Sequence, residues 1–238
     1  MHTVLTVTRK ELKAYFNSPI AYVFLVLFCG AALASFFHEA WALRQATLRP
    51  LFDTLPLLML LLVPALTMRL WSEEQKLGTL EVLLTMPVRD GEVVIGKFLA
   101  SLLLLAIGLA LTLGAALTMA FCGSVDHGPI LGGYAAALLV GAAYLSVGLL
   151  ISSLTENQIL SFLGALVVCF CLWLVGEEFF LRVWPQSLAS VFEQFGTGAR
   201  FRSIARGVLD LRDLVYYGSI IALCLSANAV ALNARKES

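Results

Sequence analysis

The chain has 238 residues, of which 60% are hydrophobic and 13% are charged. Soluble domains contain roughly 25% charged residues, so this composition excludes an ordinary soluble fold and predicts a protein whose solvent is lipid. The 16 basic and 16 acidic residues give a net charge of zero, which argues against a nucleic-acid-binding protein. No stretch has the composition of a linker, so we expect one membrane domain over residues 1–238.

The first predicted element is an amphipathic helix over residues 1–18. Its charged residues are Arg9, Lys10 and Lys13, apolar residues fill much of the remainder, and Asn17-Ser18-Pro19 ends it. A helix of this kind lies in the plane of the membrane interface, with its apolar residues toward the lipid. We therefore expect an interfacial helix ahead of the first span.

Six apolar segments follow, and each approaches or exceeds the ~20 residues that a helix needs to cross hydrocarbon. A signal peptide is the alternative for the first of them, because Ala32-Leu33-Ala34 imitates a cleavage site, but the length of the run favours a span. We predict an all-α integral membrane fold with six transmembrane helices at 19–37, 54–70, 97–121, 130–151, 158–176 and 214–232. The even number places both termini on one side, and the scarcity of Lys and Arg in short loops assigns that side to the cytoplasm.

A polar interval, residues 71–96, separates the second and third predicted spans. Its leucines recur at the spacing i, i+3 and i+7, which predicts a short cytoplasmic helix with one apolar face, of a kind that could couple a partner's movement to the spans. A plain interfacial loop is the alternative for the same pattern. The residues expected to couple the chain to a soluble partner are Glu73, Glu74, Leu77, Gly78, Thr79, Leu80, Glu81, Leu84 and Pro87.

The end of this interval contains a partial match to a nucleotide-binding motif. The stretch from Gly91 to Lys97 matches the first seven positions of the phosphate-binding pattern GxxxxGK[ST]. However, Phe98 stands where the pattern requires Ser or Thr, and no buried strand precedes Gly91. We therefore interpret Lys97 as the cytoplasmic end of the third span. The 3 histidines are far apart, and no nucleophile is paired with a base, so no catalytic, cofactor or metal site is expected.

Small residues follow at the start of the fourth span. Gly128 and Gly132, and then Gly141, Gly148 and Ser152, indicate close helix packing. The pattern suits packing within the chain and also a dimer seam, so both alternatives stay open here. The spans contain almost no ionisable residues, which argues against a carrier or channel that uses buried carboxylates.

The segment 177–213, which we call the cap, lies between the fifth and sixth spans. Apolar pieces too short to cross a bilayer alternate in it with turn signals, so we predict short re-entrant or surface helices at 179–184 and 201–211 on the periplasmic ends of the spans. Its arginines are expected to meet lipid headgroups or a periplasmic partner, with solvated charge as the alternative. The predicted cap residues are Glu177, Glu178, Trp184, Arg200, Arg202 and Arg206.

Three stretches resemble the ABC-2 type permeases of ABC transporters. The first is Glu74-x-x-x-Gly78-Thr79-Leu80-Glu81-x-Leu83-Leu84-Thr85-x-Pro87, which occupies the place where that family has the helix that docks on its ATPase. The opening stretch 9–19 and the closing stretch 200–217 look like the gliding-motility-associated branch of the family. The resemblance covers essentially the whole chain.

The resemblance implies a permease subunit of an ATP-driven transporter, an exporter in the bacterial inner membrane with cytoplasmic termini. It implies partner ABC ATPase subunits that carry ATP and Mg, a second copy or a homologous permease, and in this branch a subunit with a large periplasmic domain. ATP hydrolysis would belong to the partner and not to this chain. The alternatives are a non-transporting mechanotransducer or scaffold that acts on a periplasmic partner, and an ATP-independent channel.

Overall fold

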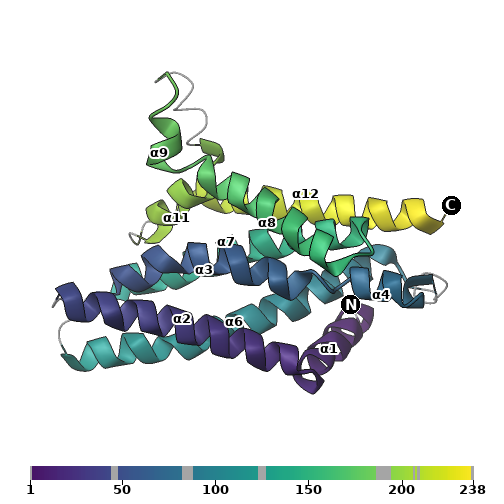
Figure 1. Ribbon diagram of the computed structural model, residues 1–238, viewed down its shortest axis with the longest axis horizontal. Coiled ribbons are helices and arrows are strands. Elements are labelled where there is room, and N and C mark those ends of the chain that lie inside the picture. Colours follow the sequence, from purple (N-terminus) through teal and green to yellow (C-terminus); the bar gives the residue numbers. More distant parts are fainter. Residues whose placement is uncertain are drawn as a thin grey trace.

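The computed structural model describes residues 2–43, 48–81, 88–122, 127–185, 194–205, 207 and 210–236. Every regular element in these ranges is a helix, which confirms the all-α prediction for the described part of the chain. Figure 1 shows long helices running side by side, with α4 (Ser72–Lys76) toward one end of the bundle and α9 (Glu178–Leu181) and α11 (Thr197–Ala205) toward the other.

Among the described residues, 5 helices are long and apolar enough to cross a membrane. The sixth apolar helix, α8 (Gln158–Leu174), has only 17 residues, fewer than the ~20 expected for a span. The structure thus confirms a multi-pass helical protein, while a sixth span at α8 stays a prediction. The five long helices are α2 (Pro19–Leu43), α3 (Arg49–Thr67), α6 (Asp90–Cys122), α7 (His127–Leu154) and α12 (Leu211–Lys236).

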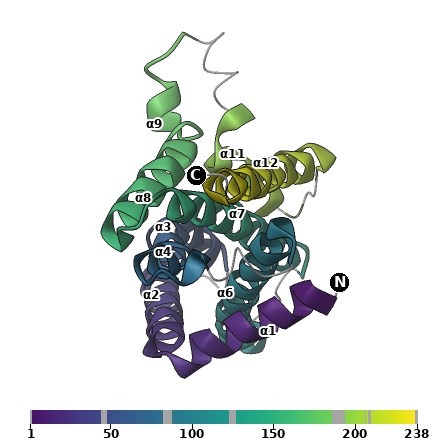
Figure 2. The ribbon, with the colours of Figure 1, turned by 90° about the vertical axis from the view of Figure 1, so that its right-hand side faces the viewer.

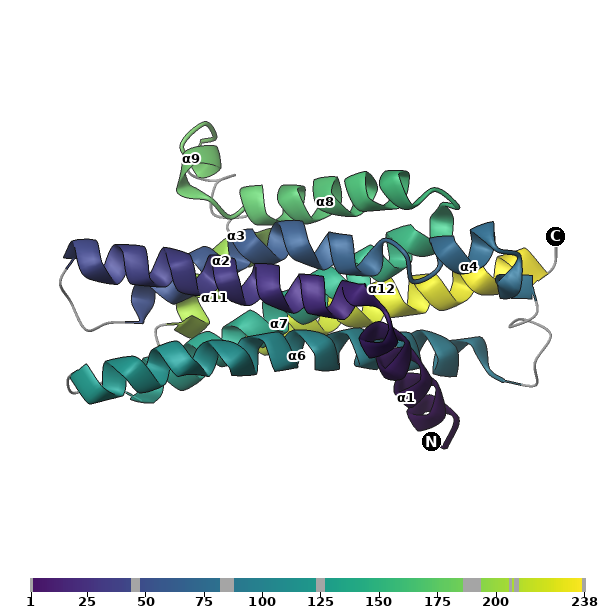
Figure 3. The same cartoon turned by 60° about the horizontal axis from the view of Figure 1, so that its bottom comes forward.

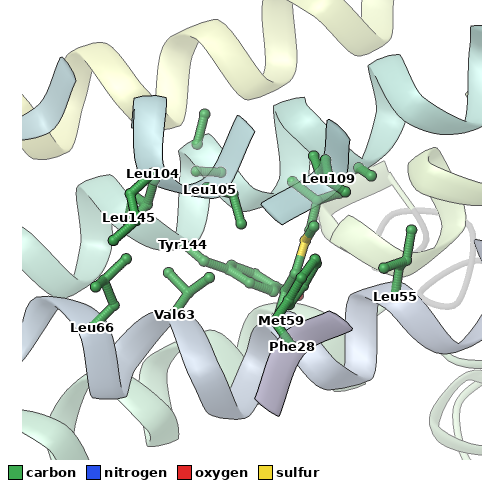
Figure 4. Packing of buried hydrophobic residues seen from close by; sticks show 14 of the residues in the cluster. Phe28, Leu55, Met59, Val63, Leu66, Leu104, Leu105, Leu109, Tyr144 and Leu145 are labelled. Carbon is green, nitrogen blue, oxygen red and sulfur yellow. The ribbon is translucent and has the colours of Figure 1, made fainter. Parts of the chain in front are cut away.

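Helix α7 forms the centre of the bundle and contacts α3, α6, α8, α11 and α12. Its residues 140–149 are all buried. Figure 4 shows Tyr144 of α7 among apolar side chains of the neighbouring helices, including Val63 of α3. The outer faces of the long helices remain apolar and exposed, with Val26 at 70% and Leu223 at 67%, as expected where the solvent is lipid.

Glycines allow neighbouring elements to approach α7 closely. A Cβ added at Gly132 would lie 2.5 Å from the carbonyl oxygen of Ile204, at the end of α11. Cβ atoms at Gly141 and Gly148 would collide with Leu105 and Thr67 in the same way. These positions are occupied by packing within the chain, so the alternative of a dimer seam along them is wrong.

Helix α1 (His2–Asn17) crosses the bundle near the α4 end, as Figures 2 and 3 show. It packs on α6, where a Cβ at Gly96 would lie only 2.6 Å from Val7 Cγ1, and the Thr8 hydroxyl donates to the Gly96 carbonyl over 3.2 Å. Lys10 and Lys13 stay exposed on another face. A helix thus occupies the predicted N-terminal position, while its place in the membrane interface stays a prediction.

Candidate functional site

A buried lysine lies where α1, α4 and α6 meet. The Lys97 side chain is 2% exposed, and its Nζ donates to Glu11 Oε1 at 3.1 Å, Glu74 Oε1 at 2.7 Å and the Leu70 carbonyl at 3.1 Å. The ammonium also lies 4.8 Å from the ring centroid of Trp71, close enough for a cation–π interaction. We call Glu11, Glu74 and Lys97, with the Leu70 carbonyl and the Trp71 ring, the Lys97 cluster.

Burying an ammonium is costly unless hydrogen bonds and opposite charges replace its water. An ammonium has three protons, and three acceptors receive them here, so the lysine is fully satisfied. The acceptors come from α1, from the turn between α3 and α4, and from α4, while the lysine belongs to α6. One charged group therefore fixes the relative positions of four segments.

Further contacts hold the α3–α4 junction against α7. The Ser152 hydroxyl accepts from the backbone nitrogens of Trp71 at 3.1 Å and Ser72 at 3.3 Å, and it donates to the Met68 carbonyl. The Gln75 side chain donates to the Ser153 carbonyl at 2.9 Å. The junction is thus joined to the central helix as well as to the Lys97 cluster.

A hydroxyl pair joins α1 to α6 one turn deeper. The Tyr15 hydroxyl lies 3.0 Å from the Ser101 hydroxyl, and both side chains are buried. Burial raises the pKa of Tyr15 above its usual value, so its hydroxyl remains neutral. The Tyr15–Ser101 contact thus joins α1 to α6 through neutral groups, beside the charged Glu11–Lys97 contact.

Two ion pairs fasten the cap at the other end of the bundle. Arg200 Nη1 lies 2.7 Å from Asp213 Oδ1 at the start of α12. Arg202 Nη1 donates to both oxygens of Glu177 at 3.0 and 3.2 Å, and its Nη2 donates to the Gly176 carbonyl at 3.1 Å. These arginines connect α11 to the end of α8 and to the beginning of α12.

Thr197 anchors the first residue of α11 below these ion pairs. Its hydroxyl lies 3.1 Å from the Tyr144 hydroxyl and 3.3 Å from the Leu172 carbonyl, and its own carbonyl accepts from the Tyr217 hydroxyl at 2.8 Å. Side chains from α7 and α12 and the backbone of α8 therefore converge on one residue. Thr197 therefore joins α11 to three neighbouring helices.

A family profile described as ABC-2 family transporter protein matches residues 5–226. The chain belongs to the ABC-2 transporter family. No curated protein matches it in a sequence search. Family membership and the long apolar helices support a multi-pass membrane permease subunit, of a kind that is generally not itself an enzyme and that typically works with ABC ATPase partners. The match is to the family as a whole, so the gliding-motility-associated branch stays a prediction.

In this ABC-2 chain, the segment predicted to be one coupling helix is not a single continuous helix. Helix α4 ends at Lys76, and Gly78 has a φ of +68°, which breaks the helix between Leu77 and Leu80. Leu77 is 67% exposed, whereas Leu80 is 5% exposed and belongs to the core. The prediction that these leucines share one helical face is therefore wrong.

The remaining predicted coupling residues are distributed as follows. Glu73 pairs with Arg69 at 3.0 Å, the Thr79 hydroxyl donates to the Glu74 carbonyl at 3.3 Å, and Glu81 is exposed. Leu84 and Pro87 lie outside the described residues. The predicted interval also ends earlier than expected, because α6 begins at Asp90, where acidic side chains favour a helix start.

The structure brings only some of the predicted cap residues together. Glu177, Arg200 and Arg202 lie at the α8–α11–α12 junction, while Trp184 is 41% exposed and packs near Phe180. Arg206 and the Glu178 side chain lie outside the described residues. Figure 1 shows α9 projecting away from the bundle, so the expectation that both short helices pack on the span ends holds only for α11.

The cap helices also differ in their bounds from the predicted 179–184 and 201–211. Helix α9 ends at Leu181, and α11 begins at Thr197 and ends at Ala205. The shift at α11 follows from its first residue, which three neighbouring helices bind. Apolar periodicity detects Phe201 and Ile204, which are buried, but it carries no signal for a polar anchor.

Sequence reasoning missed Glu11 and Asp213 as partners and treated Lys97 only as a boundary marker. Residues Gly91 to Lys97 are part of α6, so they do not form the glycine loop of a nucleotide site. The available signal for Lys97 was its position between an apolar span and an acidic segment, which requires a counter-charge if the lysine is buried.

Proposed function

We propose that this chain is the permease subunit of an ATP-driven exporter in the bacterial inner membrane. In this proposal, a partner ABC ATPase binds ATP and Mg and docks at residues 71–89, and the Lys97 cluster carries its movement into the spans. The observation that carries the proposal is the full satisfaction of one buried ammonium by groups of α1, of α4 and of the turn between α3 and α4. α8 would supply the sixth span.

The geometry suits mechanical transmission. A displacement of α4 moves Glu74, which is 2.7 Å from the Lys97 ammonium, and Lys97 is bound in turn to Glu11 of α1. Separating any of these groups leaves a charge buried without its partner, which is strongly unfavourable. The segments are therefore expected to move as one unit, and α7 follows through Ser152.

Leu77 is the proposed contact for the ATPase. It is 67% exposed directly after α4, and Gly78 turns the chain beside it. Covering this side chain with a partner would remove its apolar surface from water and so favour docking at this segment. Leu80 belongs to the chain's own core, so docking would use Leu77 together with later residues of the interval.

The complete transporter would contain two permease subunits, either two copies of this chain or this chain and a homologue, and two ATPase subunits. Both termini and the 71–89 segment would face the cytoplasm, and the cap would face the periplasm. A further subunit with a large periplasmic domain would contact the cap. A mechanotransducer that moves such a subunit without any flux would use the same Lys97 cluster.

The test is purification of the tagged chain from its native membrane in a mild detergent. We expect an ABC ATPase to co-purify, and the Leu77→Asp variant to insert normally but to retain at least about tenfold less of it, since one buried leucine contributes about 1.5–3 kcal/mol. Val183→Asp is the matched control, because Val183 is 74% exposed at the opposite end. Equal ATPase recovery with both variants, or none with the wild type, contradicts the proposal.

Coupling is then measured as ATP turnover of the purified complex in vesicles. Stimulation of turnover by a compound that accumulates on the far side indicates an exporter. ATP-dependent movement of a periplasmic subunit, with no such accumulation, indicates the mechanotransducer.

A further inference from the structure

A cavity of about 220 Å³ opens beside the Lys97 cluster. Its walls come from α1, from the α3–α4 junction and from α6, so it lies where the interfacial helix meets the ends of the spans. Charged and apolar groups both line it, among them Lys10, Glu11, Ala14, Leu70, Glu74 and Lys97.

The charges around the cavity are not evenly compensated. Glu11 and Glu74 share the single ammonium of Lys97, and Glu74 Oε2 is buried without a hydrogen-bond partner. Arg69 is already paired with Glu73. The inner wall therefore carries one excess negative charge and an unused acceptor.

The outer wall carries the opposite charge. Lys10 is exposed, and it forms no ion pair with any other described residue. A ligand that satisfies both walls needs an anionic group for Lys10 and a cationic group with N–H donors for the carboxylates. The apolar side chains of Ala14 and Leu70 line the same space and favour a ligand that continues into hydrocarbon.

We propose that this cavity binds the ethanolamine phosphate headgroup of a phospholipid. The phosphate pairs with Lys10, and the primary ammonium donates to the carboxylates of Glu11 and Glu74. The proposal depends on the interfacial position of α1, which places the cavity at headgroup depth. It does not depend on ATP coupling, so its failure leaves the permease assignment intact.

The chemistry separates ethanolamine from other common headgroups. A choline headgroup has the same charges, but its quaternary ammonium has no N–H to donate to a carboxylate. A glycerol headgroup supplies the phosphate and no cation at all. Selectivity among the three headgroups therefore reports whether the carboxylates bind the ligand.

The experiment uses the full chain reconstituted in vesicles that contain equal amounts of phosphatidylethanolamine, phosphatidylcholine and phosphatidylglycerol. After mild extraction, native mass spectrometry counts the lipids retained by each chain. We expect phosphatidylethanolamine to be retained at least about tenfold more than phosphatidylcholine, the size expected for a hydrogen bond to a charged group. Equal retention of these two lipids overturns the proposal.

Lys10→Gln and Lys13→Gln are the matched variants. Both lysines are exposed on α1, but only Lys10 lines the cavity. Lys10→Gln is expected to lower phosphatidylethanolamine retention about two- to fivefold, as for one exposed charge pair, whereas Lys13→Gln leaves it unchanged. An equal effect of both variants shows general attraction to the membrane surface and overturns the site.

A competition arm identifies the source of the headgroup. Soluble O-phosphoethanolamine carries the same charged groups without acyl chains. Retention of the lipid in the presence of excess soluble headgroup supports a lipid ligand. Displacement of the lipid by the soluble headgroup at a similar concentration shows that acyl chains contribute nothing, and it overturns the lipid assignment.

Discussion

Lys97 illustrates at the scale of one residue how a charge becomes tolerable near hydrocarbon. The side chain is 2% exposed, yet each of its protons has an acceptor and two of the acceptors are charged. Such an arrangement adds little net stability over apolar packing, but removing one partner is strongly destabilising. The lysine therefore determines how α1, α4 and α6 are arranged more than it increases the stability of the fold.

The Lys97→Met variant is expected to lose about 3 kcal/mol of stability, because Glu11 and Glu74, whose side chains are only 14% and 22% exposed, then lie together with no counter-charge. Thermal unfolding of the purified chain in detergent measures the loss. The triple variant Glu11→Gln/Glu74→Gln/Lys97→Met removes all three charges and should recover much of it. A single Lys97→Met variant as stable as the wild type would show that the carboxylates are not held by the lysine.

Gly132 provides a second test at this scale. Gly132→Ala would place a Cβ 2.5 Å from the Ile204 carbonyl oxygen and 2.9 Å from the Gly207 Cα, which are backbone atoms that cannot rotate away. We expect a loss of about 1–3 kcal/mol. Gly128→Ala is the control, because it meets nothing within 4 Å. Unfolding temperatures of the two variants should differ, and equal values would contradict the close packing of α11 on α7.

At the scale of elements, α11 is held by ion pairs as well as by its buried Phe201 and Ile204 side chains. The Arg200–Asp213 side chains are 19% and 7% exposed, whereas the Arg202–Glu177 side chains are 38% and 22% exposed. Solvent screens the second pair more effectively, so its contribution is at most about 1 kcal/mol. The Arg200–Asp213 pair is therefore expected to contribute more to the stability of α11 than the Arg202–Glu177 pair.

Hydrogen exchange of the α11 amides tests this ranking. Arg200→Gln should raise exchange of residues 197–205 more than Arg202→Gln does, because it leaves Asp213 buried without its partner. The effect of Arg202→Gln should stay below about fivefold. A larger effect of Arg202→Gln would indicate that the bonds of its guanidinium to Glu177 and Gly176 hold α11 instead.

Elements could be predicted from the sequence wherever hydrocarbon length alone decides them. The apolar segment 97–121 locates α6, and the amphipathic N-terminal segment locates α1. Contacts between distant residues could not be predicted, since Glu11 and Lys97 lie 86 positions apart and neither carries a local pattern that names the other. The leucine spacing at 77–80 failed because one backbone angle at Gly78 overrides side-chain periodicity.

At the scale of the whole molecule, the polar segments separate to opposite ends of the bundle. Figure 1 shows α4 and the C-terminus toward one end and α9 and α11 toward the other. A bilayer that crosses the long helices would place these groups on different sides of the membrane. From the scarcity of basic residues in the short outer loops, we predict that the α4 end faces the cytoplasm.

Cysteine labelling tests this orientation in intact cells, on a background that lacks the 5 native cysteines. Leu77→Cys should be protected from an impermeant thiol reagent, whereas Val183→Cys should react, because the two sites are 67% and 74% exposed at opposite ends. Permeabilised cells provide the control for reactivity. Labelling of Leu77→Cys in intact cells would reverse the assigned orientation.

The position of Lys97 along the chain has a consequence for biogenesis. The ribosome synthesises Glu11 and Glu74 before Lys97, so both counter-charges already exist when the third apolar segment reaches the insertion machinery. A charged group that enters near lipid with its partners in place avoids the cost of an unpaired charge. Nascent chains without the first 18 residues should therefore integrate the third segment less efficiently, although that segment itself is unchanged.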